Sequence, residues 1–401
     1  MTLINTLKLV LLLLVSTFTM NAQDKNSVGV NFMYGAKMFG TQGAYNGVGI
    51  NYNINTANYA SEWTKILNVQ NIAIEATLYD MSHISCGDAM TAYNIRFRDK
   101  GYFGNHIALS GGIDIRLINT NRFTLLFNPA LGVLYSTKDY VTTNGVNQIL
   151  GCHLNVIGSA KLKLDLPVTY KTHIQIGAGI SHCSNSNTSL PNIGLNKIES
   201  FIGITQGLSL TNIRAPKFDL CSNAISVELI AGYTGQITTG FYQLNGINLQ
   251  LDKSFRKETT PIAKAALSLS YTHYLNAVLG IKAGTDVVYS SKTSPLGSVT
   301  SDTARFIQTF QGDYTPVYSK FNVGLNAGID LRLGRFVVSG NYGYYLGGYE
   351  RYIYKAGGDR FEYGRLFYTT LAAKYFITRQ VAIEAKSYLN NFGGLGLQWG
   401  F

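Results

Sequence analysis

The chain is short of charge. Asp, Glu, Lys and Arg make up 14% of its 401 residues, whereas soluble globular domains carry roughly 25%. Glycine (42) and tyrosine (27) are abundant, and aromatic residues reach 12%. Few charges combined with many aromatic and small residues are typical of a transmembrane β-barrel, with aromatic girdles outside and small or polar side chains inside. A large secreted β-sandwich is the alternative class.

The chain also lacks long apolar runs. After residue 22, no segment reaches the roughly 18 apolar residues of a membrane-spanning helix, which excludes a helical membrane protein. Residues 1–22 read as a secretion signal, with Lys8, an apolar run at 9–15 and a short polar end at 19–22. No cysteine follows directly, so we expect an exported chain over residues 23–401 without a lipid anchor.

Basic residues are scattered rather than clustered, although the net charge is +11. Scattered charge offers no continuous patch to a phosphate backbone, which excludes nucleic acid as a partner. A basic exported protein could instead meet anionic lipid headgroups or the phosphates of lipopolysaccharide.

Cysteine is scarce, with four residues: Cys86, Cys152, Cys183 and Cys221. Export permits disulfides, and four cysteines allow three full pairings. Strand alternation places Cys152 and Cys183 on opposite faces, which disfavours that pair. It also separates Cys152 from His153, and His182 from Cys183, across the wall. We therefore predict no tetrahedral zinc site, no other metal and no cofactor.

Apolar residues alternate with small or polar ones along the whole chain, as in strands with one apolar face. We count about sixteen such strands. Tight turns at 119–121, 168–170, 275–277, 333–335 and 377–379 separate long polar segments at 81–103, 137–150, 185–197, 235–261 and 290–319. This sorting of connections predicts an all-β, antiparallel outer-membrane β-barrel of about 14–16 strands, with short periplasmic turns and long extracellular loops.

Two connections, 54–68 and 207–223, are long although they fall on the turn side. Segments 26–32 and 223–229 begin the two halves of the chain with mild similarity, as two tandem eight-stranded barrels would. Because alternation alone produces such matches, we predict a single barrel over residues 23–401. Its last strand ends on Phe401, which resembles the assembly signal of outer-membrane barrels, and closes the sheet so that no backbone edge faces lipid unpaired.

His182 and Ser184 form a candidate catalytic pair. They continue the apolar face of an alternating strand that runs from 174 to 180, and residues two apart on a strand lie side by side. A base beside a hydroxyl is the first requirement for activating a serine nucleophile. With the chain starting in the periplasm, this seventh strand runs outward and brings the pair to the extracellular rim, facing lipid. A hydrogen bond between them would offset the cost of polar groups there.

The residues around this pair resemble a known family. His182-Cys-Ser-Asn185, followed by Pro191-Asn-Ile-Gly194-Leu-Asn196, is similar to the signature of PagL-type outer-membrane lipid A 3-O-deacylases and of the longer acyloxyacyl-hydrolase-like barrels. The resemblance is strong over 170–205 and looser at 343–345 and 361–365. It implies a barrel whose active site lies on the outer wall and hydrolyses the ester-linked 3-hydroxyacyl chain of lipid A.

The same resemblance implies a role for each residue of the motif. Ser184 would be the nucleophile and His182 the general base. The Asn185 side chain would help stabilise the oxyanion, with Asn192 nearby.

The third member of the triad departs from the family pattern. The deacylases use a glutamate where this chain has Asn196, and Glu199 follows three residues later. Alternation places Asn196 on the outward face and Glu199 on the inward face, so Asn196 is the predicted partner of the imidazole. An amide can hold the working tautomer, although it offers no charge to an imidazolium. Outer-membrane phospholipase A is similar here, since it also combines His-x-Ser-Asn with a later Asn.

We therefore predict a serine ester hydrolase in the outer membrane of a Gram-negative bacterium, acting on lipid A of lipopolysaccharide in the outer leaflet. A second hypothesis is a phospholipase A, which would bring calcium and a homodimer into consideration. A third is a porin or structural barrel without catalysis. The sequence leaves open the acyl chain, the bond cut, the disulfide pairing, the oligomeric state and the role of residues 224–401.

Overall fold

The computed structural model describes residues 26–37, 41–57, 61–86, 101–139, 150–186, 194–208, 223–237, 259–291, 298–299, 308–309, 320–348, 366–389 and 392–401. These residues form antiparallel strands and one short helix, α2 (Glu62–Ile66). No helix among them is long and apolar enough to cross a bilayer. The predicted signal peptide, residues 1–22, lies outside the described residues.

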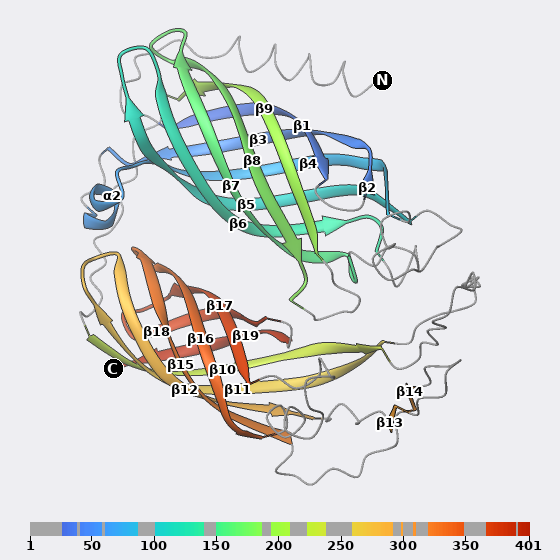
Figure 1. The fold of residues 1–401 in the computed structure, drawn as a ribbon. Helices are drawn as coiled ribbons and strands as arrows, with labels where there is room; N and C mark the ends of the chain where they lie inside the picture. The colour runs from blue at the N-terminus through green and yellow to red at the C-terminus, as the bar shows by residue number, and fades with distance from the viewer. Residues whose placement is uncertain are drawn as a thin grey trace.

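The first half of the chain closes into an eight-stranded antiparallel barrel (Figure 1). Its strands are β1 (Ser27–Lys37), β3 (Ala44–Asn55), β4 (Val69–Cys86), β5 (Gly101–Asn119), β6 (Thr124–Ser136), β7 (Leu154–Pro167), β8 (Thr172–Ser184) and β9 (Leu195–Gly207). Pairing of β1 with β9 and of β4 with β5 completes the ring. A two-residue strand, β2 (Thr41–Gln42), adds to β4 outside the ring.

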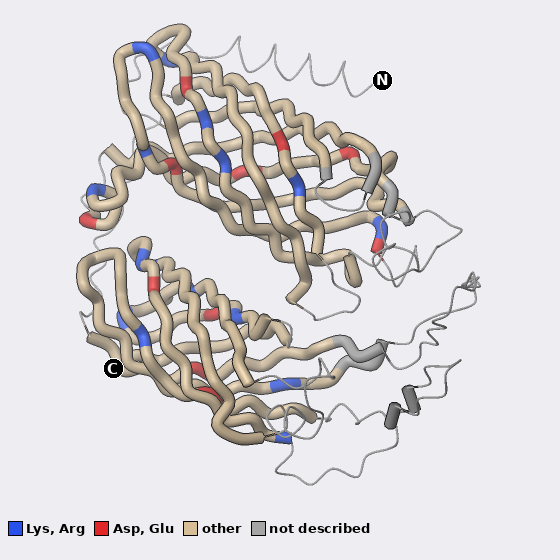
Figure 2. Tube along the Cα trace, viewed as in Figure 1, with Lys and Arg blue, Asp and Glu red and all other residues tan. Residues whose placement is uncertain are grey.

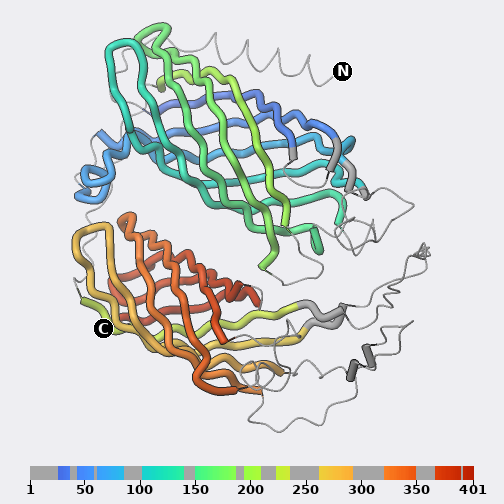
Figure 3. The backbone as a smooth tube through the Cα atoms, viewed as in Figure 1, coloured from blue at the N-terminus to red at the C-terminus, as the bar shows by residue number. Residues whose placement is uncertain are grey.

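The second half closes into a separate barrel of eight strands, which the tube in Figure 3 follows from yellow-green to red. Its strands are β10 (Asn223–Ile237), β11 (Thr259–Tyr274), β12 (Leu279–Ser290), β15 (Phe321–Leu333), β16 (Phe336–Gly348), β17 (Phe367–Phe376), β18 (Val381–Tyr388) and β19 (Phe392–Gly400). Pairing of β10 with β19 closes this ring. Two short strands, β13 (Ser298–Val299) and β14 (Gln308–Thr309), pair with each other apart from it.

The prediction of a single barrel over residues 23–401 was therefore wrong, whereas the antiparallel barrel class, the sixteen long strands and the five tight turns are confirmed. Alternation fixes the face that each side chain takes, but it does not say which distant strand closes a ring. The long connection at 207–223 links the two barrels. Because eight is an even number of strands, the chain returns to the turn side before the second barrel begins.

Each barrel has an apolar outer wall and a polar interior, which is the arrangement that lipid outside requires. Outward side chains such as Ile180 are exposed (58%). Charged residues are sparse along the strands (Figure 2), and several are paired inside. In the first barrel, Lys161 Nζ lies 3.0 Å from Glu75 Oε2 and 3.5 Å from Glu199 Oε1. These pairs neutralise carboxylates that no water shell surrounds.

An apolar cluster fills the loop end of the first barrel. It includes Met81, Phe103, Leu150, Cys183 and Leu195, each fully buried. These side chains come from the loop-side ends of several strands and from the segment before β7. Close packing there holds the rim in a fixed geometry, which a site built on that rim needs.

The other long turn-side connection, 54–68, contains helix α2, which packs against the second barrel. Trp63 on α2 belongs to an apolar cluster with Val69 and Val278, and Leu333 packs against that cluster. Gly334, in the β15–β16 turn, lies beside the Trp63 ring: a Cβ built at Gly334 would be 3.2 Å from Trp63 Nε1. The unusual length of this connection is therefore explained by contact between the barrels at their turn ends.

Candidate active site

The candidate pair lies at the loop end of β8, which is the seventh strand of the first barrel. β8 is hydrogen-bonded to β7 on one side and to β9 on the other. His182 is exposed on the outer face, in line with Ile180, and Ser184 is half-buried two residues further on. The structure thus places both residues at the rim that the sequence predicts for them, on the wall that faces away from the lumen.

Asn196 holds the imidazole of His182. The register of β8 and β9 sets the two residues directly opposite each other, and His182 Nδ1 lies 2.8 Å from Asn196 Oδ1. Because an amide oxygen only accepts hydrogen bonds, this contact places the proton on Nδ1 and leaves the Nε2 lone pair free to act as a base. The predicted partner of the imidazole is therefore within hydrogen-bond reach of it.

Gly194 forms a cradle under the same ring. Its φ of +81° lies in the left-handed region, and a Cβ built on it would lie 2.5 Å from His182 Cε1 and 3.1 Å from Nε2. Only glycine both adopts this backbone and lets the ring approach so closely. Gly194 is part of the sequence motif, but the sequence alone assigned it no role. Its position directly before a strand could have indicated a backbone conformation that only glycine adopts.

Ser184 is oriented by the turn that follows it. Its Oγ accepts a hydrogen bond from the backbone N–H of Ser186 at 3.3 Å, and Ser186 has a φ of 54°, which bends the chain sharply. The imidazole of His182 bonds Asn196, and among the described contacts no hydrogen bond joins it to Ser184. Catalytic hydrogen bonds are often long before substrate is present.

The Asn185 side chain does not fit the oxyanion role that the resemblance implies. It is 4% exposed and donates from Nδ2 to Cys152 Sγ at 3.4 Å. The reason is alternation, since Asn185 follows Ser184 directly and takes the opposite face. Its carboxamide is therefore directed to the inner side of the wall. Asn192, the other predicted contributor, lies outside the described residues.

Glu199 lies inside the barrel, as alternation predicts. It is 2% exposed, and its carboxylate accepts a hydrogen bond from Tyr45 Oη at 3.2 Å and pairs with Lys161 at 3.5 Å. The β-sheet register sets it opposite Gly179 rather than His182. It belongs to the ion network of the lumen, which leaves Asn196 as the group that contacts the imidazole.

The second barrel has no equivalent of this pair. β18 holds the seventh position there, and its sequence VAIEAKSY contains no histidine. The single histidine of residues 223–401 is His273, which lies on β11 near the turn end with its Nδ1 2.6 Å from Asn223 Oδ1. Histidine-assisted chemistry at a loop-side rim is therefore confined to the first barrel.

The thiols and acids of the described residues form no metal site. No group of three or more His, Cys, Asp or Glu side chains converges anywhere among those residues. Cys152 and Cys183 form no disulfide, and Cys183 is buried on the face opposite His182. The side chain of Cys86 and the whole of Cys221 lie outside the described residues.

Comparison with known proteins gives two family matches, one for each barrel. Residues 28–205 match the family described as lipid A 3-O-deacylase (PagL), and residues 225–401 match the acyloxyacyl hydrolase C-terminal domain. The boundary between the matches falls in the link between the barrels. No curated protein matches the chain.

Solved structures resemble the chain only weakly. The outer membrane enzyme PagL is 14% identical, with 44% of this chain and 97% of that one covered and a TM-score of 0.28. LpxR from Salmonella typhimurium is 8% identical, with 93% and 98% covered and a TM-score of 0.20. The NanC porin is 8% identical, with 93% and 97% covered and a TM-score of 0.16. Scores of this size carry no argument about this chain.

The two family matches together cover both barrels, and the first contains the motif at 182–196. These matches confirm the resemblance seen in the sequence. Together with the barrel fold, they also confirm a location in the outer membrane of a Gram-negative bacterium. Residues 28–205 thus belong to the family of lipid A 3-O-deacylases (PagL), and residues 225–401 to the family of acyloxyacyl hydrolase C-terminal domains.

Proposed function

We propose that this protein is a serine ester hydrolase that removes an ester-linked 3-hydroxyacyl chain from lipid A in the outer leaflet. The observation that carries the proposal is the 2.8 Å contact between His182 Nδ1 and Asn196 Oδ1 on the outer wall, with Ser184 next on the same face. The name of the family that matches the first barrel, lipid A 3-O-deacylase, supports this choice of substrate.

The proposed reaction needs only residues of this chain. His182 Nε2 takes the proton of Ser184 as Oγ attacks the acyl carbonyl, and the imidazolium then donates that proton to the departing sugar oxygen. Water, deprotonated by the same imidazole, hydrolyses the acyl-enzyme and releases the hydroxy fatty acid. Asn196 keeps the imidazole in the tautomer and orientation that both steps require.

The outer wall suits an acyl substrate. His182 stands among exposed apolar side chains, including Val156 on β7 and Ile198 on β9. Gly158 lies directly opposite His182 on β7, and a Cβ built there would meet nothing within 4 Å. The imidazole thus has an open space beside it in a lipid-facing wall, where an acyl chain can approach without leaving an apolar environment.

Mass spectrometry of lipid A from cells that express the protein tests the proposal. We expect lipid A lighter by one 3-hydroxyacyl group, and unchanged lipid A from cells that express Ser184→Ala to the same level. A matched control is Ser200→Ala, an exposed serine on the outer face of β9 that should leave trimming intact. Trimming by Ser184→Ala, or none by the wild type, would contradict the proposal.

The same experiment separates the two other hypotheses. The combination of histidine, serine and asparagine favours a phospholipase A as the second candidate, and it would deplete phospholipids while lipid A stays whole. A porin or structural barrel would change neither lipid. Nothing in the comparisons supports the homodimer that accompanies the phospholipase hypothesis.

A further inference from the structure

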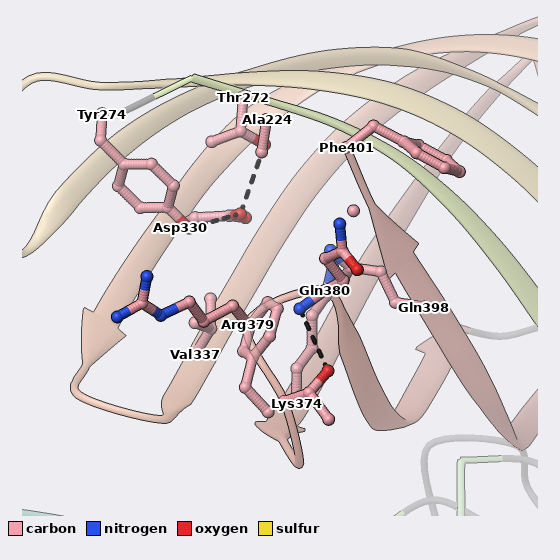
Figure 4. Close-up of a pocket in the computed structure, with 13 residues that line it drawn as sticks. Ala224, Thr272, Tyr274, Asp330, Val337, Lys374, Arg379, Gln380, Gln398 and Phe401 are labelled. Carbon is pink, nitrogen blue, oxygen red and sulfur yellow. Dashed lines mark hydrogen bonds between the residues drawn. The ribbon is translucent and has the colours of Figure 1, made fainter. Parts of the chain in front are cut away.

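The second barrel contains a cavity at its turn end that the proposed hydrolase does not use. Its volume is about 400 Å³, and it lies inside the ring of strands next to the β17–β18 turn. Among the residues that line it are Thr272, Tyr274, Asp330, Phe376, Arg379 and Phe401 (Figure 4). Pockets that bind small molecules have volumes of roughly 300–1,000 Å³ and combine apolar walls with a few polar groups.

Asp330 presents an unsatisfied carboxylate to this cavity. The residue is 4% exposed, and its Oδ1 has no hydrogen-bond partner. Oδ2 receives only two long hydrogen bonds, from Thr272 Oγ1 and Tyr274 Oη, both at 3.5 Å. No Lys, Arg or His nitrogen of the described residues lies within the 4.0 Å of an ion pair with it. A buried carboxylate in this condition is costly unless something binds it.

Among the described residues of the second barrel, Asp330 differs from the other buried acids because no lysine pairs with it, while Arg332 on the same strand lies over the Tyr274 ring, with Cζ 4.0 Å from its centroid. Among those described residues, the buried charged side chains are three lysines and four acids: Lys282, Lys374, Lys386, Glu228, Asp286, Asp330 and Glu384. The three lysines pair with Glu228, Glu384 and Asp286. Asp330 is the acid that no lysine pairs with, and it is the one that lines the cavity.

Arg379 supplies the opposite charge at the mouth. It lies in the β17–β18 turn, is exposed, and forms no ion pair with any acid of the described residues. In Figure 4 its side chain lies below Tyr274 and Asp330 in the view, with its guanidinium group towards the left. The cavity therefore has the Asp330 carboxylate and the Lys374 ammonium, which is paired with Glu228, in its lining, and the Arg379 cation in the turn beside it.

We propose that this cavity binds a small zwitterion, with an ammonium group on Asp330 and an anionic group on Arg379. A primary ammonium can donate a charged hydrogen bond to Asp330 Oδ1. A metal ion fits less well, because Asp330 is the single acidic residue in the cavity lining. The turn end is the periplasmic end of such barrels, so the ligand enters from the periplasm.

Titration of the full-length protein in detergent micelles tests this site, with heat of binding as the measurement. Three probes are used. Free phosphoethanolamine carries both charges, ethanolamine carries the cation alone, and inorganic phosphate carries the anion alone. The variants are Asp330→Asn and Arg379→Gln, and Arg122→Gln is the control because it changes an exposed turn arginine of the first barrel. Gel mobility without heating reports whether each variant forms its barrels.

We expect phosphoethanolamine to bind most tightly and phosphate most weakly. Asp330→Asn should weaken both amines at least about tenfold, the effect of losing one charged hydrogen bond. Arg379→Gln should weaken phosphoethanolamine towards ethanolamine and leave ethanolamine unchanged, and Arg122→Gln should match the wild type. Displacement of the free probe by phosphatidylethanolamine in the micelle would identify the ligand as a lipid headgroup, and its failure to displace would identify a free molecule.

Three results would overturn the proposal, the third of which applies where Asp330→Asn does not fold. One is no saturable binding of either amine at about 10 mM, well above the dissociation constant of even a weak millimolar site. The second is equal binding by the wild type and Asp330→Asn. If Asp330→Asn does not form its barrels, the variant Arg379→Gln, in an exposed turn, takes its place. Equal binding of phosphoethanolamine by the wild type and Arg379→Gln would then overturn the proposal.

Discussion

Replacing Asn196 with alanine should slow the reaction at the chemical step. The side chain accepts one hydrogen bond from His182 Nδ1 at 2.8 Å. In the ground state this bond joins two neutral groups and contributes about 1 kcal/mol, but in the transition state the imidazole is charged and the bond contributes about 1.5–3 kcal/mol. The alanine variant loses the difference between the two states, about 0.5–2 kcal/mol. Since about 1.4 kcal/mol is a factor of ten in rate, we expect kcat to fall about 2- to 30-fold.

Initial rates of hydroxy fatty acid release from lipid A in mixed micelles measure this effect. KM should stay unchanged, because Asn196 contacts the imidazole and not the substrate. Asn196→Asp keeps an acceptor at the same position and adds a negative charge, so it should be at least as active as the wild type. Ser200→Ala, on the same face of β9, is the control and should retain full activity.

The opposite outcome is an Asn196→Ala variant with full activity, or one with a raised KM and an unchanged kcat. Either result would mean that the contact seen in the structure does not orient the base. A further check uses the Ser184→Ala background, in which Asn196→Ala should have no additional effect on the residual rate, because the two residues act as one unit.

Other substitutions test the surroundings of the site and the lumen. Gly194→Ala should displace the imidazole and lower kcat about 100-fold, as misplacement of a catalytic group by about 1 Å does. The variant should still form its barrels on unheated gels. The control is Gly111→Ala, on the open outer wall, and equal activity of the two variants would contradict the close packing of His182 on Gly194. Gly158→Leu should fill the space beside the imidazole and lower kcat/KM in the same assay, whereas Gly111→Leu should not, and unaffected hydrolysis would mean that substrate does not approach there. Lys161→Met should lower the free energy of unfolding by about 3–5 kcal/mol in a urea titration in micelles, because it leaves two buried carboxylates without their cation; an unchanged midpoint would show that the pair adds nothing.

The sequence was enough to predict the strands, their faces and the tight turns, because each depends on neighbours in the chain. Alternation correctly separated His182 from Cys183, and Asn196 from Glu199. Alternation could not predict which strands close each barrel, because the pairing of β1 with β9 joins residues far apart in the chain. The clue lay in the connection at 207–223, whose length has its reason in linking two rings rather than two neighbouring strands.

The site itself was predictable in part. A separation of two residues on a strand is a local relation, so the spacing alone was enough to place His182 and Ser184 side by side. The contact of His182 with Asn196 needed the register between β8 and β9, and its prediction relied on alternation plus the family signature. The packing of the ring on Gly194 and the burial of Asn185 against Cys152 depend on backbone angles and on a neighbouring strand, which spacing does not reveal.

Capture of the nucleophile tests the central claim most directly. The protein in micelles is treated with a fluorophosphonate that carries an alkyl chain, and the modified residue is located by mass spectrometry of its peptides. The account predicts a single adduct on Ser184, absent from Ser184→Ala and strongly reduced in His182→Ala. Lipid A hydrolysis that continues while Ser184 remains unmodified, or an adduct on a different residue that stops it, would contradict the account.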